Sequence, residues 1–119
     1  MKLAPYPEYK DSGVPWLGKI PAHWDATKLK RVSHVQTGIT LGKRYEKAVL
    51  VERPYLRVAN VQNGFLNLKH IKTVAVPAKE AESAELRTGD VVITEGGDID
   101  KLGRGAIWNG EIEYCLHQN

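Results

Sequence analysis

Cysteine is almost missing from this sequence, since Cys115 is the only one among 119 residues. One thiol forms no disulfide within the chain and cannot build a thiolate cage around a metal ion. Long apolar runs are missing too, because no stretch approaches the roughly 20 apolar residues that a membrane-spanning helix needs. The opening residues MKLAPYP lack the apolar core of a secretory signal. We therefore expect a soluble protein in a reducing, intracellular setting, with no membrane partner.

Residue sets that carry catalysis or bind cofactors are also scarce. The histidines are scattered without an H-x3-H spacing, and neither a G-x-G-x-x-G nor a Walker pattern is present. Asp98 and Asp100 resemble the start of a calcium loop, but the remaining ligands are missing. We expect no catalytic residue, no metal and no bound cofactor. One alternative stays open, a small enzyme or metal-binding domain that uses Asp90, Glu95, Asp98 and Asp100.

Charge, by contrast, is present and unevenly distributed. Residues 28–79 hold eleven basic and two acidic residues, whereas residues 80–119 hold three basic and nine acidic ones. Such asymmetry favours one surface that faces a polyanion. The alternative is that the two halves neutralise each other in the folded chain.

The first 24 residues are rich in proline, glycine and tryptophan. Proline has a fixed φ and no N–H donor, so we expect an extended segment without a regular element. Trp16 and Trp24 are expected to act as packing anchors.

The whole chain, residues 1–119, is expected to form a single α+β domain built on a strand-dominated twisted sheet with short helices. The expected elements are a helix through about Ser33 that is capped by Asp25 or Thr27, strands over 55–61 and 91–94, a helix over 78–85 entered at Pro77, and a hairpin at Asn109-Gly110 that pairs Ile107 with Ile112. In the last strand, apolar residues at 112, 114 and 116 alternate with 111, 113, 115 and 117. This strand would end the chain with an unpaired edge, which predicts a truncated domain.

A second hairpin is expected at Asn63-Gly64, because both residues accept positive φ. Pairing Gln62 with Phe65 places apolar residues on one face and polar residues on the other. A two-stranded ribbon fits the major groove of DNA, and amides and lysine match base edges. The candidate base-reading residues are Asn60, Gln62, Asn67 and Lys69.

Two loops are candidates for contact with phosphate. One is basic and holds Lys43, Arg44 and Lys47. The other is the glycine-rich loop from Glu95 to Arg104, in which Arg104 could grip a phosphate or read guanine. Its carboxylates at 95, 98 and 100 could accept from a cytosine amino group, so this loop competes with the hairpin as the base-reading site.

Several segments of the sequence resemble the target-recognition domain of the specificity subunit of type I restriction–modification systems. They are DSGVPWLGKIPAHW at 11–24, KLKRV at 28–32, TG at 37–38, PYLRVANV at 54–61 with Gly64, GDVVIT at 89–94 after Leu86, and LGR at 102–104. The W-L-G-x-I-P-x-x-W opening is fairly specific, and the resemblance spans almost the whole chain.

This resemblance implies a DNA-binding subunit without catalysis of its own, in a prokaryotic cytoplasm. Its partners would be duplex DNA, modification subunits that methylate adenine, and a restriction subunit that cleaves. S-adenosylmethionine, ATP and Mg would belong to those partner subunits. Such specificity subunits carry two recognition domains joined by long helices, each reading half of a split site, whereas this sequence holds one domain and no heptad-bearing helix. The resemblance assigns no individual base contact.

Other functions stay open at this point. The same kind of domain occurs as the recognition region of fused restriction and methylation enzymes. A protein-interaction module that uses the acidic helix at 78–85 is a further alternative.

Overall fold

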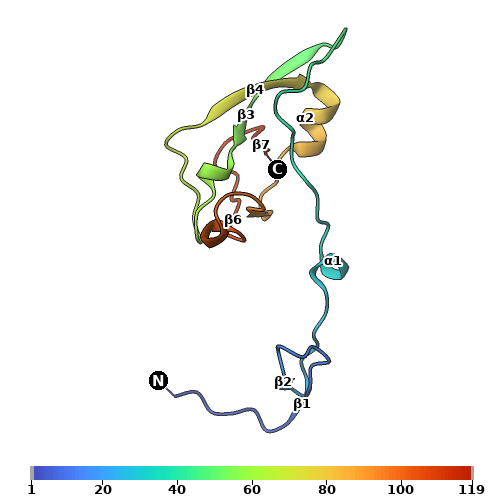
Figure 1. The fold of residues 1–119 in the computed structure, drawn as a ribbon, viewed down its shortest axis with the longest axis vertical. Helices are drawn as coiled ribbons and strands as arrows, with labels where there is room; N and C mark the ends of the chain where they lie inside the picture. Colours follow the sequence, from blue (N-terminus) through green and yellow to red (C-terminus); the bar gives the residue numbers. More distant parts are fainter. Residues whose placement is uncertain (1, 119) are drawn as a thin grey trace. The chain divides into compact units, whose positions relative to one another are not determined.

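The computed structural model describes residues 2–118, and the chain forms two compact units, Met1–Gln36 and Thr37–Asn119 (Figure 1). The first unit contains β1 (Tyr9–Asp11), β2 (Lys19–Pro21) and α1 (Leu29–Val32). The second unit contains β3 to β7, α2 and two 3-10 turns. Each unit is described by itself below.

The first unit contains a small antiparallel hairpin, in which Tyr9 pairs with Pro21 and Asp11 with Lys19. The chain reverses between these strands through Gly13 and Gly18, which have φ of +76° and +69°. The expectation of no regular element before residue 24 is therefore wrong. Proline did not prevent pairing, because Pro21 occupies the end of β2 and Pro15 lies in the turn.

Aromatic side chains gather around Tyr6 in this unit. The Tyr6 ring lies 5.6 Å from Trp24 and 5.3 Å from His23, centroid to centroid. Trp24 therefore packs as expected, although it is half exposed, whereas Trp16 is 85% exposed and does not act as an anchor.

The helix α1 is shorter than expected and lacks the expected cap. Its N-cap is Lys28, whose side chain makes no capping hydrogen bond. At the other end, the Ser33 hydroxyl donates to the carbonyl of Leu29 (2.8 Å). Neither Asp25 nor Thr27 occupies the capping position.

The second unit is centred on a three-stranded sheet with strand order β4-β3-β7. β3 (Leu50–Leu56) pairs antiparallel with β4 (Lys72–Pro77), which places Val51 beside Val76. Directly after β4, α2 (Ala78–Ala84) packs on this sheet with Pro77 as its N-cap. The first core cluster consists of Ile39, Tyr55, Val76, Ala81, Ala84 and Leu116.

The strand expected at 55–61 is displaced toward the N-terminus. β3 ends at Leu56, and the 3-10 turn η1 (Val58–Asn60) follows. The cause is Asn60, which is 3% exposed and whose side-chain amide bonds to the surrounding backbone, ending the extended conformation. The partner strand β4 has no counterpart among the expected elements.

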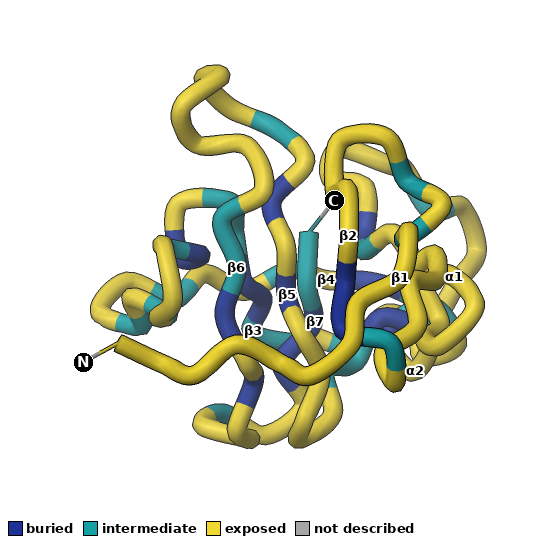
Figure 2. The backbone as a smooth tube through the Cα atoms, turned by 90° about the horizontal axis from the view of Figure 1, so that it is seen from below, coloured by how far each residue is buried: buried dark blue, intermediate teal, exposed yellow. Residues whose placement is uncertain are grey.

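A two-stranded ribbon forms the other half of this unit. β5 (Val91–Ile93) confirms the strand expected there and pairs antiparallel with β6 (Gly105–Ile107). The turn η2 (Ile99–Lys101) lies between them. Only the middle residue of β5 is buried. The second core cluster consists of Leu56, Val61, Val92, Trp108 and Cys115. In Figure 2, which colours the backbone by burial, both β5 and β6 contain a buried position.

The hairpin expected at Asn109-Gly110 does not form. Trp108 is 1% exposed, and its backbone N–H donates to Asp90 while its carbonyl accepts from Gly89. These bonds direct β6 to β5 instead of to residue 112.

The strand β7 (Leu116–His117) lies parallel to β3, with Leu116 beside Tyr55. On its other side, Ile39 N–H donates to the carbonyl of His117 (2.8 Å), and Leu86 N–H donates to Cys115 (2.8 Å). The expected unpaired edge is therefore wrong.

The expected alternation along this last strand is also wrong, since Cys115 and Leu116 are both buried. Tyr114, with φ of +55°, interrupts the extended chain just before them and is 57% exposed.

The strand-dominated α+β class is confirmed, although the strands within residues 2–118 occupy three small sheets instead of one. The two α-helices of the described residues have four and seven residues. No helix in residues 2–118 combines the length and the apolar character needed to cross a membrane.

Candidate nucleic-acid interface

The hairpin at Asn63-Gly64 forms with the expected register. Val61 bridges Leu66, and Gln62 N–H donates to the carbonyl of Phe65 (2.9 Å). Gly64 has φ of +83°, but Asn63 stays at negative φ, which is the pattern of a type II turn.

Asn60 does not share the exposed polar face that the sequence assigned to it. Its Oδ1 accepts from Arg57 N–H (2.8 Å), and its Nδ2 donates to the carbonyls of Asn67 (2.8 Å) and His70 (3.2 Å). Both N–H donors of this amide are used inside the fold. A paired contact with adenine needs one of these donors, so Asn60 is built as a structural residue.

Asn67 and Lys69 are exposed on the same hairpin segment. Asn67 Oδ1 accepts from the backbone N–H of Lys69 (3.2 Å), which leaves the Asn67 amide nitrogen available to a ligand. The Lys69 ammonium takes part in none of the ion pairs found in residues 2–118.

Gln62 connects the hairpin to the glycine-rich loop. Its Nε2 donates to the carbonyl of Ala59 (2.8 Å), and its Oε1 accepts from Arg104 Nη1 (3.4 Å). The backbone joins the same two segments, because Gly64 N–H donates to the carbonyl of Gly105 (2.9 Å). The hairpin and the loop, which the sequence left as competing sites, therefore form one surface. No local pattern signals this contact, since its partners are 42 residues apart.

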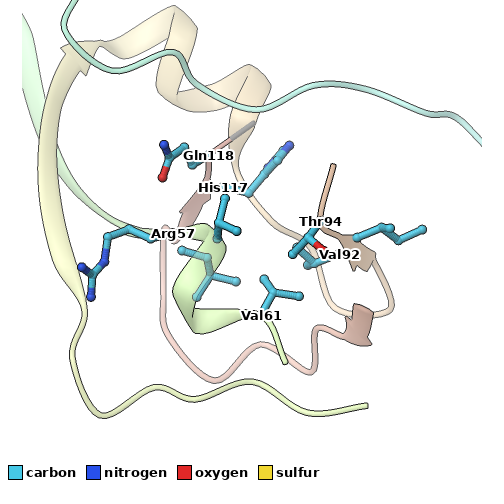
Figure 3. Close-up of a pocket in the computed structure, with 9 residues that line it drawn as sticks. Arg57, Val61, Val92, Thr94, His117 and Gln118 are labelled. Carbon is cyan, nitrogen blue, oxygen red and sulfur yellow. The ribbon is translucent and has the colours of Figure 1, made fainter. Parts of the chain in front are cut away.

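A cavity of about 240 Å³ lies between these segments, lined by Val58, Val61, Gln62, Thr94, Lys101 and Arg104. It shares Val58, Val61 and Thr94 with a much smaller cavity of about 10 Å³ (Figure 3). The smaller cavity holds one water molecule at most. The larger cavity is the one of these two with room for a ligand group, and it carries two cationic side chains.

The basic loop at 43–47 lies at the other end of β3, on the α2 side. Lys43 Nζ pairs with Glu80 of α2 (3.4 Å), and the Tyr45 hydroxyl donates to the second oxygen of that carboxylate (2.8 Å). Burial, together with this hydrogen bond to Glu80, raises the pKa of Tyr45. Arg44 and Lys47 are exposed and take part in no ion pair of residues 2–118.

The structure therefore does not bring all the phosphate candidates together. The seven residues of β3 separate the basic loop from the hairpin, a length of about 20 Å at 3.3 Å per residue. Arg104 lies beside the hairpin, whereas Lys43, Arg44 and Lys47 form a second, separate basic patch.

The charges of the two halves of the sequence do not cancel through direct pairing. Among the ion pairs of residues 2–118, only Lys43 with Glu80 joins the basic segment 28–79 to the acidic segment 80–119. From residue 53 to residue 79 the chain contains five basic residues and no acidic one. Residues 53–79, which we call the hairpin segment, therefore keep their net positive charge in the folded unit.

Two of the four carboxylates proposed for the alternative metal site have contacts, and each contacts a different partner. Asp90 accepts from the backbone N–H of Arg87 (2.8 Å), and Asp98 pairs with Lys101 (2.8 Å). Residues 2–118 contain no group of three or more histidine, cysteine or acidic side chains that could hold a metal ion. The geometry gives this alternative no support.

Comparison with known proteins finds one distant relative. The chain is 22% identical over 103 residues to a protein of Methanocaldococcus jannaschii assigned as the type I restriction enzyme MjaX specificity subunit. The alignment covers 85% of this chain and 24% of that protein, so the chain spans about a quarter of the relative's length. No family model and no solved structure matches the chain.

Proposed function

We propose that this chain binds duplex DNA and reads one half of a split site, as a target-recognition domain of a type I restriction–modification specificity subunit. The observation that carries the proposal is the joined surface of the hairpin and the glycine-rich loop. It presents Gln62, Asn67 and Arg104 together with a hairpin segment that has no acidic residue. The distant similarity to an assigned specificity subunit supports the same function.

In this proposal the two basic surfaces have different tasks. Arg44, Lys47 and the lysines of the hairpin segment contact phosphates, which fixes the position of the domain on the duplex without reading sequence. Amide and guanidinium groups at the hairpin reach base edges in the major groove.

Catalysis is not assigned to this chain. Methylation and cleavage would belong to modification and restriction subunits, which would also hold S-adenosylmethionine, ATP and Mg. The proposal places the complete assembly in the cytoplasm.

Salt dependence of binding tests this proposal. Anisotropy titrations of a labelled random-sequence duplex between 50 and 300 mM KCl should give a slope of log K against log salt of about −4 to −5, as expected if four to six phosphates are neutralised. Binding that is absent at 50 mM, or that does not change with salt, would rule out the proposed function.

Charge reversal locates the phosphate contacts. Lys69→Glu should weaken binding to every duplex alike and make the slope less negative by about one or more. Lys2→Glu is the matched control, because it makes the same charge change at an exposed lysine outside the basic segment. Equal effects of the two variants would mean that Lys69 influences binding only through the net charge of the chain and not through a phosphate contact. Arg44→Ala and Lys47→Ala apply the same test to the separate basic patch.

A further inference from the structure

Arg104 is held in place from three directions. Its carbonyl accepts from Thr94 N–H (2.8 Å) and from the Thr94 hydroxyl (3.3 Å), and its N–H donates to the carbonyl of Lys101 (3.4 Å). Its guanidinium donates from Nη1 to Gln62 Oε1 (3.4 Å), and the residue is partly buried. Thr94 is itself 6% exposed and faces the same space as Val61 (Figure 3). The backbone of Arg104 is therefore held by Thr94 and Lys101, and its guanidinium is oriented by one long contact with Gln62.

The side-chain amide of Gln62 takes part in holding Arg104 in place. Its Nε2 donates to Ala59, and its Oε1 accepts from Arg104, so each end of the amide already has a partner. Recognition of adenine by glutamine needs the oxygen and the nitrogen of the same amide together. These two contacts orient the Gln62 amide within the fold, and we assign this residue as a support for the guanidinium.

The second cation of the cavity, Lys101, differs from Arg104 in its partner. The Lys101 ammonium is paired with the carboxylate of Asp98 (2.8 Å), which compensates its charge. The partner of the Arg104 guanidinium is the uncharged amide of Gln62, which orients the guanidinium without neutralising its charge. Arg104 thus keeps its full charge and the remaining N–H donors of its planar fork.

We infer that Arg104 reads a guanine through O6 and N7 in the major groove, and that Gln62 is the residue that positions it. This inference rests on the proposed function and, of the two roles that the sequence left open for Arg104, selects base reading over phosphate contact. A fixed, planar pair of N–H donors matches the two acceptors of guanine, and arginine to guanine is the commonest specific contact in protein–DNA complexes. Positioning of the guanidinium by a neighbouring side chain gives the fixed geometry that such a paired contact needs.

The experiment begins with selection of bound sequences from a randomised duplex pool with the full chain. In the enriched duplex, each guanine is replaced singly by 7-deazaguanine, which removes the N7 acceptor and keeps the base pair. At one guanine, this replacement should weaken binding of the parent roughly 5- to 100-fold, the size of a good base contact. The same replacement should change the affinity of Arg104→Ala by less than about twofold, since the contact is already lost.

Two further variants separate reading from charge and from folding. Arg104→Lys keeps the positive charge and hence the salt slope, but its single ammonium replaces the planar fork, so the effect of 7-deazaguanine at that position should become smaller without being abolished. Gln62→Leu keeps the side-chain size and removes the amide, and its effect should be non-additive with Arg104→Ala. Lys2→Ala, at an exposed position of the first unit, is the control and should retain the 7-deazaguanine effect. Thermal melting of each variant verifies that it is folded.

The outcomes distinguish this inference from the proposed function. If the parent binds DNA with the expected salt slope but no single 7-deazaguanine matters, the inference is wrong and the proposed function stands. Equal losses by Arg104→Ala on enriched and random duplexes would mean a phosphate contact, which also overturns the inference. If the chain binds no duplex at all, both fail together.

Discussion

Asn60 holds together the turn that follows β3. Its side-chain amide satisfies the N–H of Arg57 and the carbonyls of Asn67 and His70 in a buried position. Asn60→Ala leaves these backbone groups without their partner, so we expect the free energy of unfolding to fall by about 1–3 kcal/mol. Urea unfolding followed by circular dichroism measures this loss.

Asn67→Ala is the matched control for this prediction. Asn67 is exposed, and its amide oxygen accepts a local bond from the backbone of Lys69. Its replacement should change stability by no more than about 0.5 kcal/mol. Similar losses in the two variants would contradict the structural role of Asn60.

The thiol of Cys115 gives a prediction about pH. Burial is the main cause that raises the pKa of Cys115 to about 11, and Glu111 adds to this. The folded state therefore binds the thiol proton more tightly than the unfolded state, whose pKa is near 9.0. The resulting stability is fully present below pH 9 and is lost as the pH rises toward 11.

Between pH 8 and pH 10.5 the parent should therefore lose about 2 kcal/mol more of its unfolding free energy than Cys115→Ala. Groups that titrate in the same range are common to both proteins, so the difference isolates the thiol. Urea unfolding at both pH values gives the comparison, and parallel losses would show that Cys115 does not contribute.

At the scale of elements, local signals predicted local structure. The turn at Asn63-Gly64 and the helix after Pro77 depend on residues within a few positions of each other, and both form. The pairing of β3 with β7 joins Tyr55 to Leu116, far apart in sequence, and no local pattern encodes it. The Asn109-Gly110 turn signal was overridden because the burial of Trp108 directs its strand to β5.

The candidate site was predicted to a similar degree. Gln62 and Arg104 were each named from their chemistry, but their contact comes from tertiary packing and was not expected. Asn60 was placed on the wrong face because alternation along a strand was assumed where the chain turns into a 3-10 helix. The sequence therefore indicated which side chains have suitable hydrogen-bonding groups, but it did not predict on which face of the fold each side chain lies.

Gly38 controls how closely the chain approaches β7. A Cβ built at this position would lie 2.0 Å from the carbonyl oxygen of His117, which also accepts the N–H of Ile39. Gly38→Ala should therefore separate these segments and lower stability by about 1–3 kcal/mol or more. Gly96→Ala, where a Cβ meets nothing within 4 Å and φ is not positive, should change stability far less. Thermal melting of both variants tests this, and equal melting temperatures would contradict the close approach.

At the scale of the molecule, both core clusters lie in the second unit. Among residues 2–36 of the first unit, Ile20 and Pro21 are the buried ones. We therefore expect a fragment of residues 37–119 to fold alone, with a cooperative urea transition close to that of the full chain. A fragment that shows no cooperative transition would mean that residues 1–36 are required for the fold.

The placement of β7 affects the order in which the protein can fold during synthesis. A ribosome that has released residues only up to Tyr114 has produced β3, β4 and α2 without the strand that covers Ile39 and Tyr55. Contacts between residues distant in sequence form late and slowly, and an uncovered strand edge invites association with other chains. The edge of β3 that pairs with β7 consequently stays open to other chains until Leu116 emerges.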